Sequence, residues 1–373
     1  MVEIIEVKTK KQRKEFVKFP LRLYKGNKYF VPPLFGDEMK MFTEKNVYYN
    51  TCLSVFYLAL RDGKTVGRIQ GIVQKQYNEI HGTQQVRFTR FDCVEDEEVA
   101  KALFEAVEAW GKANGMTEIV GPLGYSDLER EGLLIEGFDQ TQTFEDQYNY
   151  EYYAKLIENN GYVKDTDWLE YRLLRAIVGV DRLNKLLEKT MERYNLHFGG
   201  VGMKKGAFIK KYAPGIFHCI DVCYRDLYGT VPFTKEMTEQ MVSQFKLVLN
   251  IDYIRVICDE QENVVAFMLC LPGIGSAVQK SGGRLTIGCL WRLLKAIKKP
   301  RVVDLGLVGI LPEYRKSAVG VAFFSVLENI LKSGNVEYLE TNLNLEDNIA
   351  VQATWKRFEN IQHKRRRSYK KEI

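Results

Sequence analysis

The chain has 373 residues, about 2.5 times a typical domain of roughly 150 residues, so we expect two compact units or one large one. A hydrophobic content of 46%, an aromatic content of 12% and a net charge of only +6 exclude an intrinsically disordered chain. No apolar run approaches the roughly 20 residues that cross a membrane, and the first residues lack the pattern of a secretory signal. We therefore expect a cytoplasmic protein without a membrane partner.

The first half of the chain begins its regular pattern with two strands and a tight turn. Asp62-Gly63 separates the alternating runs Val55–Leu60 and Val66–Val73, which predicts a hairpin. Apolar residues then recur every three or four positions from Val99 to Trp110, as in an amphipathic helix. An apolar strand, Thr117–Val120, is predicted after this helix.

The glycine-rich segment Gly121–Phe138 follows that strand and has no counterpart of equal length later in the chain. Its mixture of polar side chains, among them Tyr125, Glu129 and Arg130, suits a substrate loop near a cleft. A purely structural loop capped by Asp127 is the alternative.

The seven cysteines form no CxxC pair and no regular framework, so we expect reduced thiols. Cys219 and Cys223 lie four residues apart, next to His218, and a helix would place both thiols on one face. A structural zinc site usually needs four ligands, and no second Cys/His pair lies at a matching spacing. The sequence therefore predicts buried core cysteines and no metal site.

A repeat relates the two halves of the chain. When the sequence is shifted by 220 positions, identical residues align at four places in the helices Ala102–Lys112 and Ala322–Lys332. Each helix leads into an apolar strand, and a helix with aromatic residues follows in each half, at Tyr150–Glu158 and Ile349–Phe358. The order of elements is therefore shared, in addition to the four identities.

The second half also begins with a hairpin, formed by the runs Tyr253–Ile257 and Val264–Leu271. The order strand, strand, strand, helix, strand, helix thus occurs twice. We predict an α/β (α+β) protein of two duplicated domains, 1–175 and 176–373, with a joint at 175–180. Each domain should hold a mixed, mostly antiparallel sheet flanked by helices.

One strand-to-helix turn of the second copy carries the clearest chemical signal. An apolar strand runs to Pro312, a basic turn with Arg315 and Lys316 follows, and a helix opens at 318–320. Unpaired amides at a helix N-terminus suit a phosphate or pyrophosphate, and small residues let a ligand approach the backbone. The matching turn of the first copy, residues 95–98, holds four acidic residues and should repel the same anion. An ordinary turn with surface cations is the alternative.

This turn resembles the acyl-CoA pyrophosphate loop of the GNAT acyltransferases, whose pattern is [Gln/Arg]-x-x-[Gly/Ala]-x-[Gly/Ala] between a strand and a long helix. The matching run here is Arg315-Lys316-Ser317-Ala318-Val319-Gly320, preceded by Leu311-Pro312-Glu313-Tyr314. Asn348, with Trp355 and Phe358 after it, is similar to the family's segment that follows the fifth strand. The first half looks like a second, degenerate GNAT unit, because its loop is acidic. The whole chain therefore resembles tandem GNAT proteins.

The resemblance implies an acyl-CoA site in the second copy, for acetyl-CoA or another acyl-CoA. Its binding residues would be Val308, Gly309, Ile310, Arg315, Lys316, Ser317, Ala318, Val319, Gly320 and Asn348. GNAT chemistry needs a base for the amine and a backbone amide for the oxyanion, which should come from 308–310. Glu340 and Glu313 are the candidate bases, and Tyr314 is a candidate acid.

Trp355 departs from the family pattern, because GNAT enzymes frequently have a general-acid tyrosine at that place. An indole cannot usefully donate a proton to the leaving thiolate. Tyr314, or Tyr153 from the first half, would have to substitute, or the thiolate leaves unassisted, which its pKa near 8.5 allows.

The last ten residues, 364–373, carry six basic residues and one acidic residue, and so most of the net charge. Clustered cations could hold RNA phosphates. Arg365, Arg367 and Tyr369 share one parity, however, which indicates a terminal strand whose solvated basic edge is protected by charge. We therefore expect no nucleic-acid partner.

The sequence and the resemblance together predict an enzyme, an acyl-CoA-dependent N-acyltransferase. The acyl group is most simply acetyl, and the acceptor is a small-molecule or peptide amine. Two alternatives stay open. One is an aminoacyl-tRNA-dependent transferase of the same tandem fold, and the other is a non-catalytic acyl-CoA-binding module, which the tryptophan at position 355 favours.

Overall fold

Contacts divide the chain into two compact units, each containing segments from distant parts of the sequence. The computed structural model describes the backbone of residues 1–178 and 180–373 and the side chains of residues 1–178 and 183–373. Unit 1 comprises residues 1–169, 275–290 and 363–373, and unit 2 comprises residues 170–274 and 291–362. The domain bounds 1–175 and 176–373 stay a prediction, and residue 179 of the predicted joint at 175–180 lies outside the described residues. The division by contacts additionally assigns residues 275–290 and 363–373 to unit 1.

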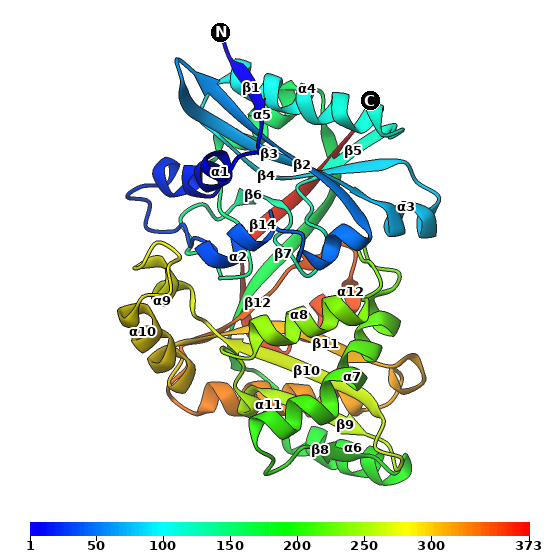
Figure 1. Ribbon diagram of the computed structural model, residues 1–373. Coiled ribbons are helices and arrows are strands. Elements are labelled where there is room, and N and C mark those ends of the chain that lie inside the picture. The colour runs from blue at the N-terminus through cyan, green and yellow to red at the C-terminus, as the bar shows by residue number, and fades with distance from the viewer. Residues whose placement is uncertain (179) are drawn as a thin grey trace. The chain divides into compact units, whose positions relative to one another are not determined.

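Unit 1 is built on strands in the order β1-β2-β3-β4-β5-β14 (Figure 1). The strands that belong to it in whole or part are β1 (Glu3–Glu6), β2 (Cys52–Arg61), β3 (Lys64–Gln74), β4 (Gln85–Cys93), β5 (Glu118–Gly121), β6 (Leu133–Glu136), β7 (Val163–Ala176) and β14 (Phe358–Glu372). Its helices are α1 (Lys10–Leu23), α2 (Phe35–Lys40), η1 (Val47–Asn50), α3 (Lys75–His81), α4 (Glu97–Ala113), α5 (Tyr152–Asn159) and α9 (Gly275–Gln279). The pairs β1–β2, β2–β3, β3–β4, β5–β14 and β6–β14 are antiparallel, and β4 and β5 are parallel.

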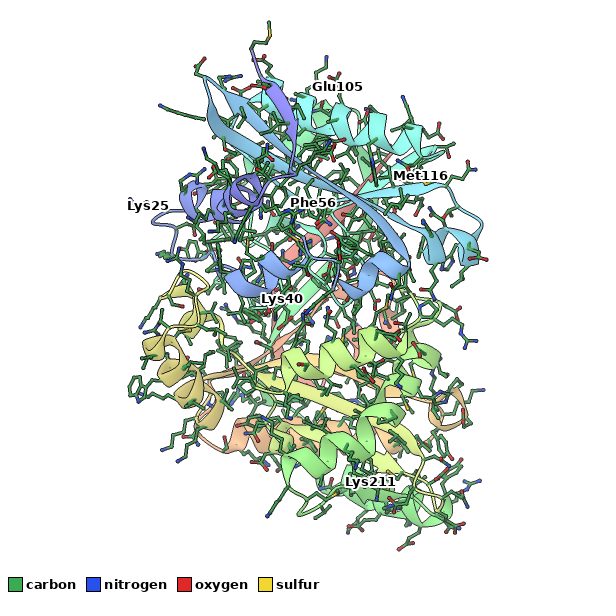
Figure 2. The ribbon with its side chains drawn as sticks, viewed as in Figure 1. Lys25, Lys40, Phe56, Glu105, Met116 and Lys211 are labelled. Atoms are coloured by element: carbon green, nitrogen blue, oxygen red, sulfur yellow. The ribbon has the colours of Figure 1, made fainter. Side chains whose placement is uncertain are left out.

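Helix α4 forms the core of unit 1 with one face of this sheet. Its apolar stripe, which includes Leu103, Phe104 and Val107, is fully buried against side chains such as Phe88. The opposite, polar side of the helix faces solvent, and Figure 2 labels Glu105 there. Burial of such a stripe is the main source of helix stability in a folded protein.

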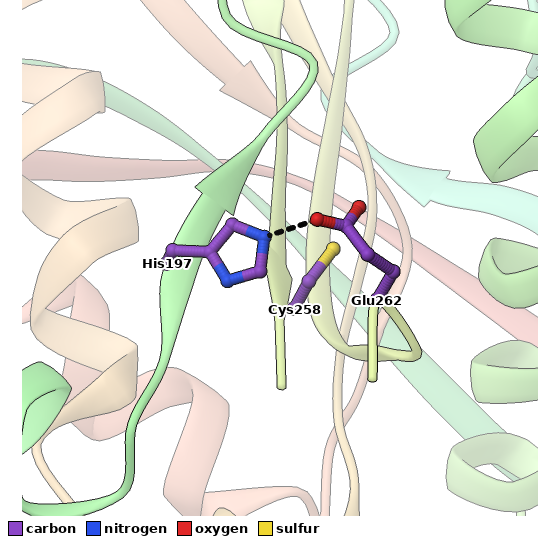
Figure 3. Close-up of side chains that lie close together, drawn as sticks. All are labelled: His197, Cys258 and Glu262. Carbon is purple, nitrogen blue, oxygen red and sulfur yellow. Dashed lines mark hydrogen bonds and ion pairs between the residues drawn. The ribbon is translucent and has the colours of Figure 1, made fainter. Parts of the chain in front are cut away.

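Unit 2 is built on strands in the order β7-β12-β11-β10-β9-β8. Besides parts of β7 and β14, its strands are β8 (His197–Gly199), β9 (Ile254–Cys258), β10 (Val264–Pro272), β11 (Val302–Ile310), β12 (Tyr338–Thr341) and β13 (Asn344–Leu345). Its helices are α6 (Val180–Arg193), α7 (Lys205–Tyr224), α8 (Lys235–Phe245), η2 (Ile251–Tyr253), most of α10 (Ile287–Lys298), η3 (Pro312–Tyr314), α11 (Val319–Lys332) and α12 (Ile349–Trp355). Figure 3 shows the edge of this sheet, where β8 pairs with β9.

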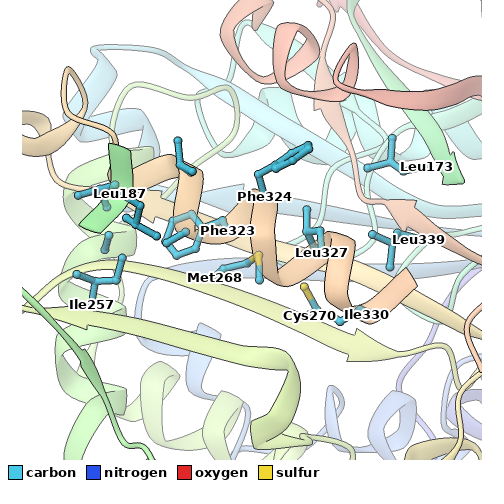
Figure 4. Close-up of a cluster of buried hydrophobic side chains, with 14 of the residues drawn as sticks. Leu173, Leu187, Ile257, Met268, Cys270, Phe323, Phe324, Leu327, Ile330 and Leu339 are labelled. Carbon is cyan, nitrogen blue, oxygen red and sulfur yellow. The ribbon is translucent and has the colours of Figure 1, made fainter. Parts of the chain in front are cut away.

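Two apolar clusters cover the two faces of the unit 2 sheet. On one face, α11 packs its Phe323, Phe324 and Leu327 against Met268 of β10 (Figure 4). On the other face, α7 contributes a second cluster that contains Phe267 of β10. Both faces of the sheet are thus buried, as the nearly unbroken apolar sequence of β10 requires.

The predicted repeat is confirmed at the level of element order. The segment β2-β3-β4-α4-β5-α5 in unit 1 corresponds to β9-β10-β11-α11-β12-α12 in unit 2. In both units the antiparallel ladder to the third strand of the series, β4 or β11, contains a register shift. In both, that strand then pairs in parallel with the next strand over only three or four residues. Beyond this short stretch the two parallel strands are no longer paired, and this happens at corresponding places in the two units.

Strand β14 corrects the prediction for the basic segment. The strand exists, but it lies inside the sheet beside β5, so the predicted solvated edge is wrong. Lys364, Arg366 and Ser368 are at most 1% exposed. The cations of this segment are neutralised within unit 1, because Arg365 and Arg367 both contact the buried carboxylate of Asp167. Alternation correctly indicated a strand, but it could not say which strands flank it.

Within the described part of the chain, none of the helices combines the length and the apolar character needed to cross a membrane.

Candidate active site

The turn that precedes α11 brings the predicted loop residues together at the end of β11. Residues 312–314 form the short helix η3, and α11 begins at Val319. Arg315 and Lys316 are exposed, and the Nε of Arg315 donates to the carbonyl of Ile310 at 3.2 Å. Ser317 closes the turn, since its hydroxyl donates to the carbonyl of Tyr314 at 2.6 Å. The predicted loop is therefore a compact basic turn.

The N-terminus of α11 is open to a ligand. Its N-cap is Ala318, which has no side chain that could accept an amide hydrogen bond. Ser317 Oγ accepts from the amide of Val319 at 3.3 Å, a long contact. A β-carbon placed at Gly320 would meet only the Cδ1 atom of Ile310, at 3.5 Å, so there is space above the first turn. The residues present fit a phosphate group, because the amides and the dipole of the helix N-terminus adjoin a turn with two exposed cations.

The corresponding helix of unit 1 is closed in the same place. Asp96 is the N-cap of α4, and its carboxylate accepts from the amide of Val99 at 3.2 Å. Arg61 pairs with Asp96 and, at 2.7 Å, with Glu98. The acidic side chains already satisfy this helix N-terminus, which disfavours an added anion.

The edge of β11 beyond Leu305 is free of its parallel neighbour, because pairing with β12 ends at Thr341. In the ladder to β10 the amide of Leu311 donates to the carbonyl of Val265. Since amides alternate along a strand, those of Val308 and Ile310 point to the open side. The predicted oxyanion donor therefore has two candidate amides with the required direction.

Tyr224, the last residue of α7, occupies this open edge. Its hydroxyl accepts from the amide of Val308 at 3.1 Å and donates to the carbonyl of the same residue at 2.9 Å. A phenol is thus held beside the amide that the sequence predicted as an oxyanion donor. No motif around Tyr224 indicated this position, because it depends on how α7 packs on the sheet.

The predicted acid and base residues lie in different environments. Glu340 on β12 is 2% exposed and pairs with Arg172 at 3.5 Å, so it belongs to a buried ion pair. Glu313 is exposed in η3. Burial raises the pKa of the neighbouring Tyr314 hydroxyl, and the carboxylates of Asp259 and Glu313 add to the shift. Tyr314 is therefore protonated at neutral pH, as a proton donor must be.

The remaining residues of the predicted site serve the local fold. Asn348 caps α12, its side-chain oxygen accepting from the amide of Val351 at 3.3 Å. Trp355 is buried and donates its indole N–H to Asn344 Oδ1 at 3.1 Å. Tyr153 is fully buried in unit 1, where its hydroxyl contacts that of Tyr24 at 2.9 Å.

A polar pocket of unit 1 was not predicted as a whole. It measures about 40 Å³ and lies beside the polar residues of β3 and β4. Two bridges line it, from Arg68 to Asp92 at 2.8 Å and from Arg90 to Glu38 through two contacts of 3.0 Å. Burial alone would raise the pKa of Glu38, but the adjacent Arg90 guanidinium lowers it to about 2.

Arg130 gives this pocket an extra positive charge. It comes from the segment 121–138 that the sequence suggested as a substrate loop, and it lines the pocket. Its Nη2 donates to the carbonyl of Phe144 at 2.6 Å. Within the described residues, no carboxylate pairs with it at salt-bridge distance. Burial accordingly lowers its pKa, which nearby carboxylates partly offset. By contrast, Tyr125 and Glu129 of the same segment bond to each other and shape the loop.

A third cluster, of His197, Cys258 and Glu262, lies at the edge of unit 2 (Figure 3). The imidazole Nε2 and Glu262 Oε1 are 3.0 Å apart, and the second carboxylate oxygen accepts from Lys211 at 2.7 Å. Burial raises the pKa of the Cys258 thiol to about 11. A protonated thiol and a carboxylate already paired with lysine are poor metal ligands, so this cluster is better described as an ion pair.

The chain is similar to several known proteins. No family model matches the chain. It is 28% identical to Protein YghO of Escherichia coli (strain K12), over 98% of this chain and 94% of that protein. It is 27% identical to the bacterial ceramide synthase of Caulobacter vibrioides (strain NA1000 / CB15N), over 86% of this chain and 83% of that protein.

Among solved structures, a tandem GNAT protein from the clavulanic acid biosynthesis pathway matches 100% of this chain and 98% of its own, with a TM-score of 0.54 and 13% identity. At that identity the likeness concerns the fold. Together with the duplicated element order, the two matched sheet openings and the basic turn before α11, it shows that this chain has the tandem GNAT fold.

Proposed function

We propose that the protein is an acyl-CoA-dependent N-acyltransferase whose thioester site is the turn 315–320 of unit 2. The contrast between the two helix N-termini is the observation that carries this proposal. Helix α11 begins with an uncapped, small-residue turn that holds Arg315 and Lys316. Helix α4 begins with Asp96 and two further acids already engaged in the fold. One copy suits a pyrophosphate and the other does not.

The bound thioester supplies an activated acyl carbon. The acceptor amine must lose a proton, and its nitrogen forms the new bond to that carbon while the carbon–sulfur bond breaks. CoA leaves as a thiolate, which takes a proton from Tyr314 or from water. On the open edge of β11, the amide of Ile310 is oriented to donate to the developing oxyanion, whereas the amide of Val308 donates to the Tyr224 hydroxyl, which an oxyanion would have to displace. Glu313 is the candidate base, because the carboxylate of Glu340 is already paired with Arg172.

For the acceptor, we propose a long-chain amino alcohol of the kind that becomes N-acylated in a ceramide. This proposal rests on the resemblance to the Caulobacter protein named a ceramide synthase, which covers most of both chains. It favours a long acyl-CoA over acetyl-CoA as the donor. A small-molecule or peptide amine with acetyl-CoA is the second candidate, supported by the tandem GNAT fold alone.

The test combines binding with product analysis. The purified protein is mixed with acetyl-CoA or palmitoyl-CoA and with sphinganine, a polyamine or a peptide, and amides are sought by mass spectrometry. The charge reversal Arg315→Glu with Lys316→Glu should weaken CoA binding at least tenfold in calorimetry, through loss of both cations. The matched change in unit 1, Glu97→Lys with Glu98→Ala, should leave one CoA bound per chain.

Each outcome has a defined meaning. Unchanged CoA affinity in the charge-reversal variant would reject the assigned turn. CoA binding without product from any amine would favour an acyl-CoA-binding module. Product formation that requires aminoacyl-tRNA instead of a thioester would favour the tRNA-dependent alternative.

A further inference from the structure

Helix α10 (Ile287–Lys298) exposes a row of large apolar side chains. Its exposed stripe consists of Ile287, Leu290, Trp291 and Leu294, which are 89%, 39%, 65% and 62% exposed. Their spacing of three and four residues puts them on one side of the helix. Leu285, just before the helix, is 50% exposed and extends the apolar surface.

A different side of the same helix packs against the rest of the protein. Cys289 and Leu293 are at most 3% exposed and hold α10 in place. Since two positions of the helix are buried and four large apolar ones are not, packing within the chain does not explain the exposed stripe. Contiguous apolar surface of this kind marks an interaction site.

The surroundings of the stripe are strongly basic. From position 263 to position 303 the sequence contains no Asp or Glu and has seven Lys or Arg residues. Within α10, the exposed Lys295 and Lys298 accompany the stripe, and Lys295 Nζ lies 5.7 Å from the centre of the Trp291 ring. Lysine and arginine beside an apolar stripe can reach the headgroups of anionic lipids while the stripe enters the acyl region.

We propose that α10 is an interfacial helix that lays its exposed stripe on an anionic lipid surface. Its 12 residues are too few to span a bilayer, which needs roughly 20, but they suffice to lie in its surface. A tryptophan with a lysine over its ring suits the headgroup boundary. The expectation of no membrane partner considered spanning segments only, and surface binding needs none. This inference does not depend on the proposed acyl transfer.

A protein partner is the competing occupant, and the charge pattern argues against it. Interface cores are depleted of lysine relative to the remaining surface, whereas this segment concentrates lysine around its apolar row. Basic side chains next to an anionic bilayer are attracted by its negative surface potential. The positive charge around the stripe therefore favours an anionic lipid surface over a protein partner.

Cosedimentation with vesicles tests the proposal on the full chain. Vesicles of equal parts phosphatidylglycerol and phosphatidylcholine should bind the protein at low salt, and pure phosphatidylcholine should bind it at least fivefold less. Trp291, the most exposed of the tryptophans described, should shift its emission to shorter wavelength on binding. The double variant Trp291→Ser with Leu294→Ser should partition at least tenfold less and lose the emission shift.

Two further variants complete the design. Ile349→Ser, which removes a 67% exposed apolar side chain from α12, should bind vesicles as the unmodified protein does. Lys295→Gln with Lys298→Gln should remove most of the preference for phosphatidylglycerol. All variants change exposed or half-buried positions, and equal thermal unfolding verifies their fold.

The proposal is overturned if the unmodified protein ignores anionic vesicles or if the Trp291→Ser, Leu294→Ser variant binds them equally well. Self-association in sedimentation velocity that this variant abolishes, without vesicle binding, would instead assign the stripe to a second copy of the chain. None of these measurements includes CoA or an amine, so their failure is distinguishable from failure of the acyltransferase proposal.

Discussion

A substitution at Gly320 should affect ligand binding without affecting folding. Its backbone has an ordinary conformation, and an added β-carbon meets only Ile310 at 3.5 Å. We therefore expect Gly320→Val to leave the midpoint of thermal unfolding nearly unchanged while lowering CoA affinity at least tenfold, because the side chain fills the space that a pyrophosphate needs. Calorimetry and a thermal melt of the same sample measure both. Full affinity in this variant would place the CoA site elsewhere.

Tyr314 tests whether a phenol replaces the acid that Trp355 cannot provide. Because a thiolate is a tolerable leaving group near neutral pH, we expect Tyr314→Phe to reduce turnover by less than about 100-fold, at the low end of general acid catalysis. The measurement is the rate at saturating thioester. If all turnover disappears while CoA affinity stays, Tyr314 is the essential acid. Tyr224→Phe is the matched comparison, since that hydroxyl lies on the edge of β11.

Glu38 should make the stability of unit 1 depend on pH. Burial opposes its ionisation, but Arg90 lowers the pKa from the usual 4.5 to about 2 in the folded state. The folded state therefore binds fewer protons than the unfolded state between these values, so the stabilisation is complete above pH 4.5 and disappears as the pH falls toward 2.

The variant Glu38→Gln leaves the Arg90 guanidinium buried without its carboxylate. We expect it to lower the free energy of unfolding at neutral pH by about 3 kcal/mol, as for other broken buried pairs. Its stability should also change less between pH 4.5 and 2 than that of the unmodified protein. Urea unfolding at several pH values measures both, and parallel pH profiles would contradict the assignment.

At the scale of elements, β14 should be a structural strand. The side chain of Asp167 is 0% exposed. Its carboxylate accepts hydrogen bonds from Arg365 and Arg367 and forms an ion pair with Lys164 at 3.2 Å. We expect Asp167→Asn to lower the free energy of unfolding by about 3 kcal/mol, because it leaves several cations without their shared carboxylate. Urea unfolding gives this value directly.

The matched control for Asp167→Asn is the exposed pair Arg175–Glu359. Its side chains are 79% and 46% exposed, and solvent screens such a pair. Glu359→Gln should therefore change the free energy of unfolding by less than about 0.5 kcal/mol. Equal effects of the two variants would show that the bonds of Asp167 contribute nothing beyond an exposed pair.

The sequence predicted local elements well because their causes are local. The turn Asp62-Gly63 has positive φ at both residues, 51° and 71°, and it joins β2 and β3 as expected. The helices Glu97–Ala113 and Val319–Lys332 follow the three- and four-residue spacing that predicted them.

The features that sequence analysis missed depend on contacts between distant segments. The neighbours of β14 are set by pairing across the chain, for which alternation contains no information. The pocket of unit 1 joins residues from α2, β3 and β4 to Arg130 of a later loop. Tyr224 reaches Val308 across 84 positions of sequence. The turn at 315–320 could be predicted because its residues are consecutive in the sequence.

At the scale of the molecule, the two copies differ in where their polar and charged residues lie. The sheet of unit 1 has a charged pocket and a closed helix N-terminus at α4. The sheet of unit 2 has an apolar cluster on each face and an open helix N-terminus at α11. The order of elements is thus the same in both copies, while the residues at the two helix N-termini differ.

The position of β14 has a consequence for how the protein is made. Residues 363–373 belong to unit 1, yet a ribosome reaches them only after it has synthesised all of unit 2. At roughly 5 to 20 residues per second, the edge of β5 stays open for about 12 to 50 s, as a template for mispairing with other nascent chains. A premature stop codon in unit 2 would therefore also leave unit 1 unfinished, and chaperones should have their greatest effect during this interval.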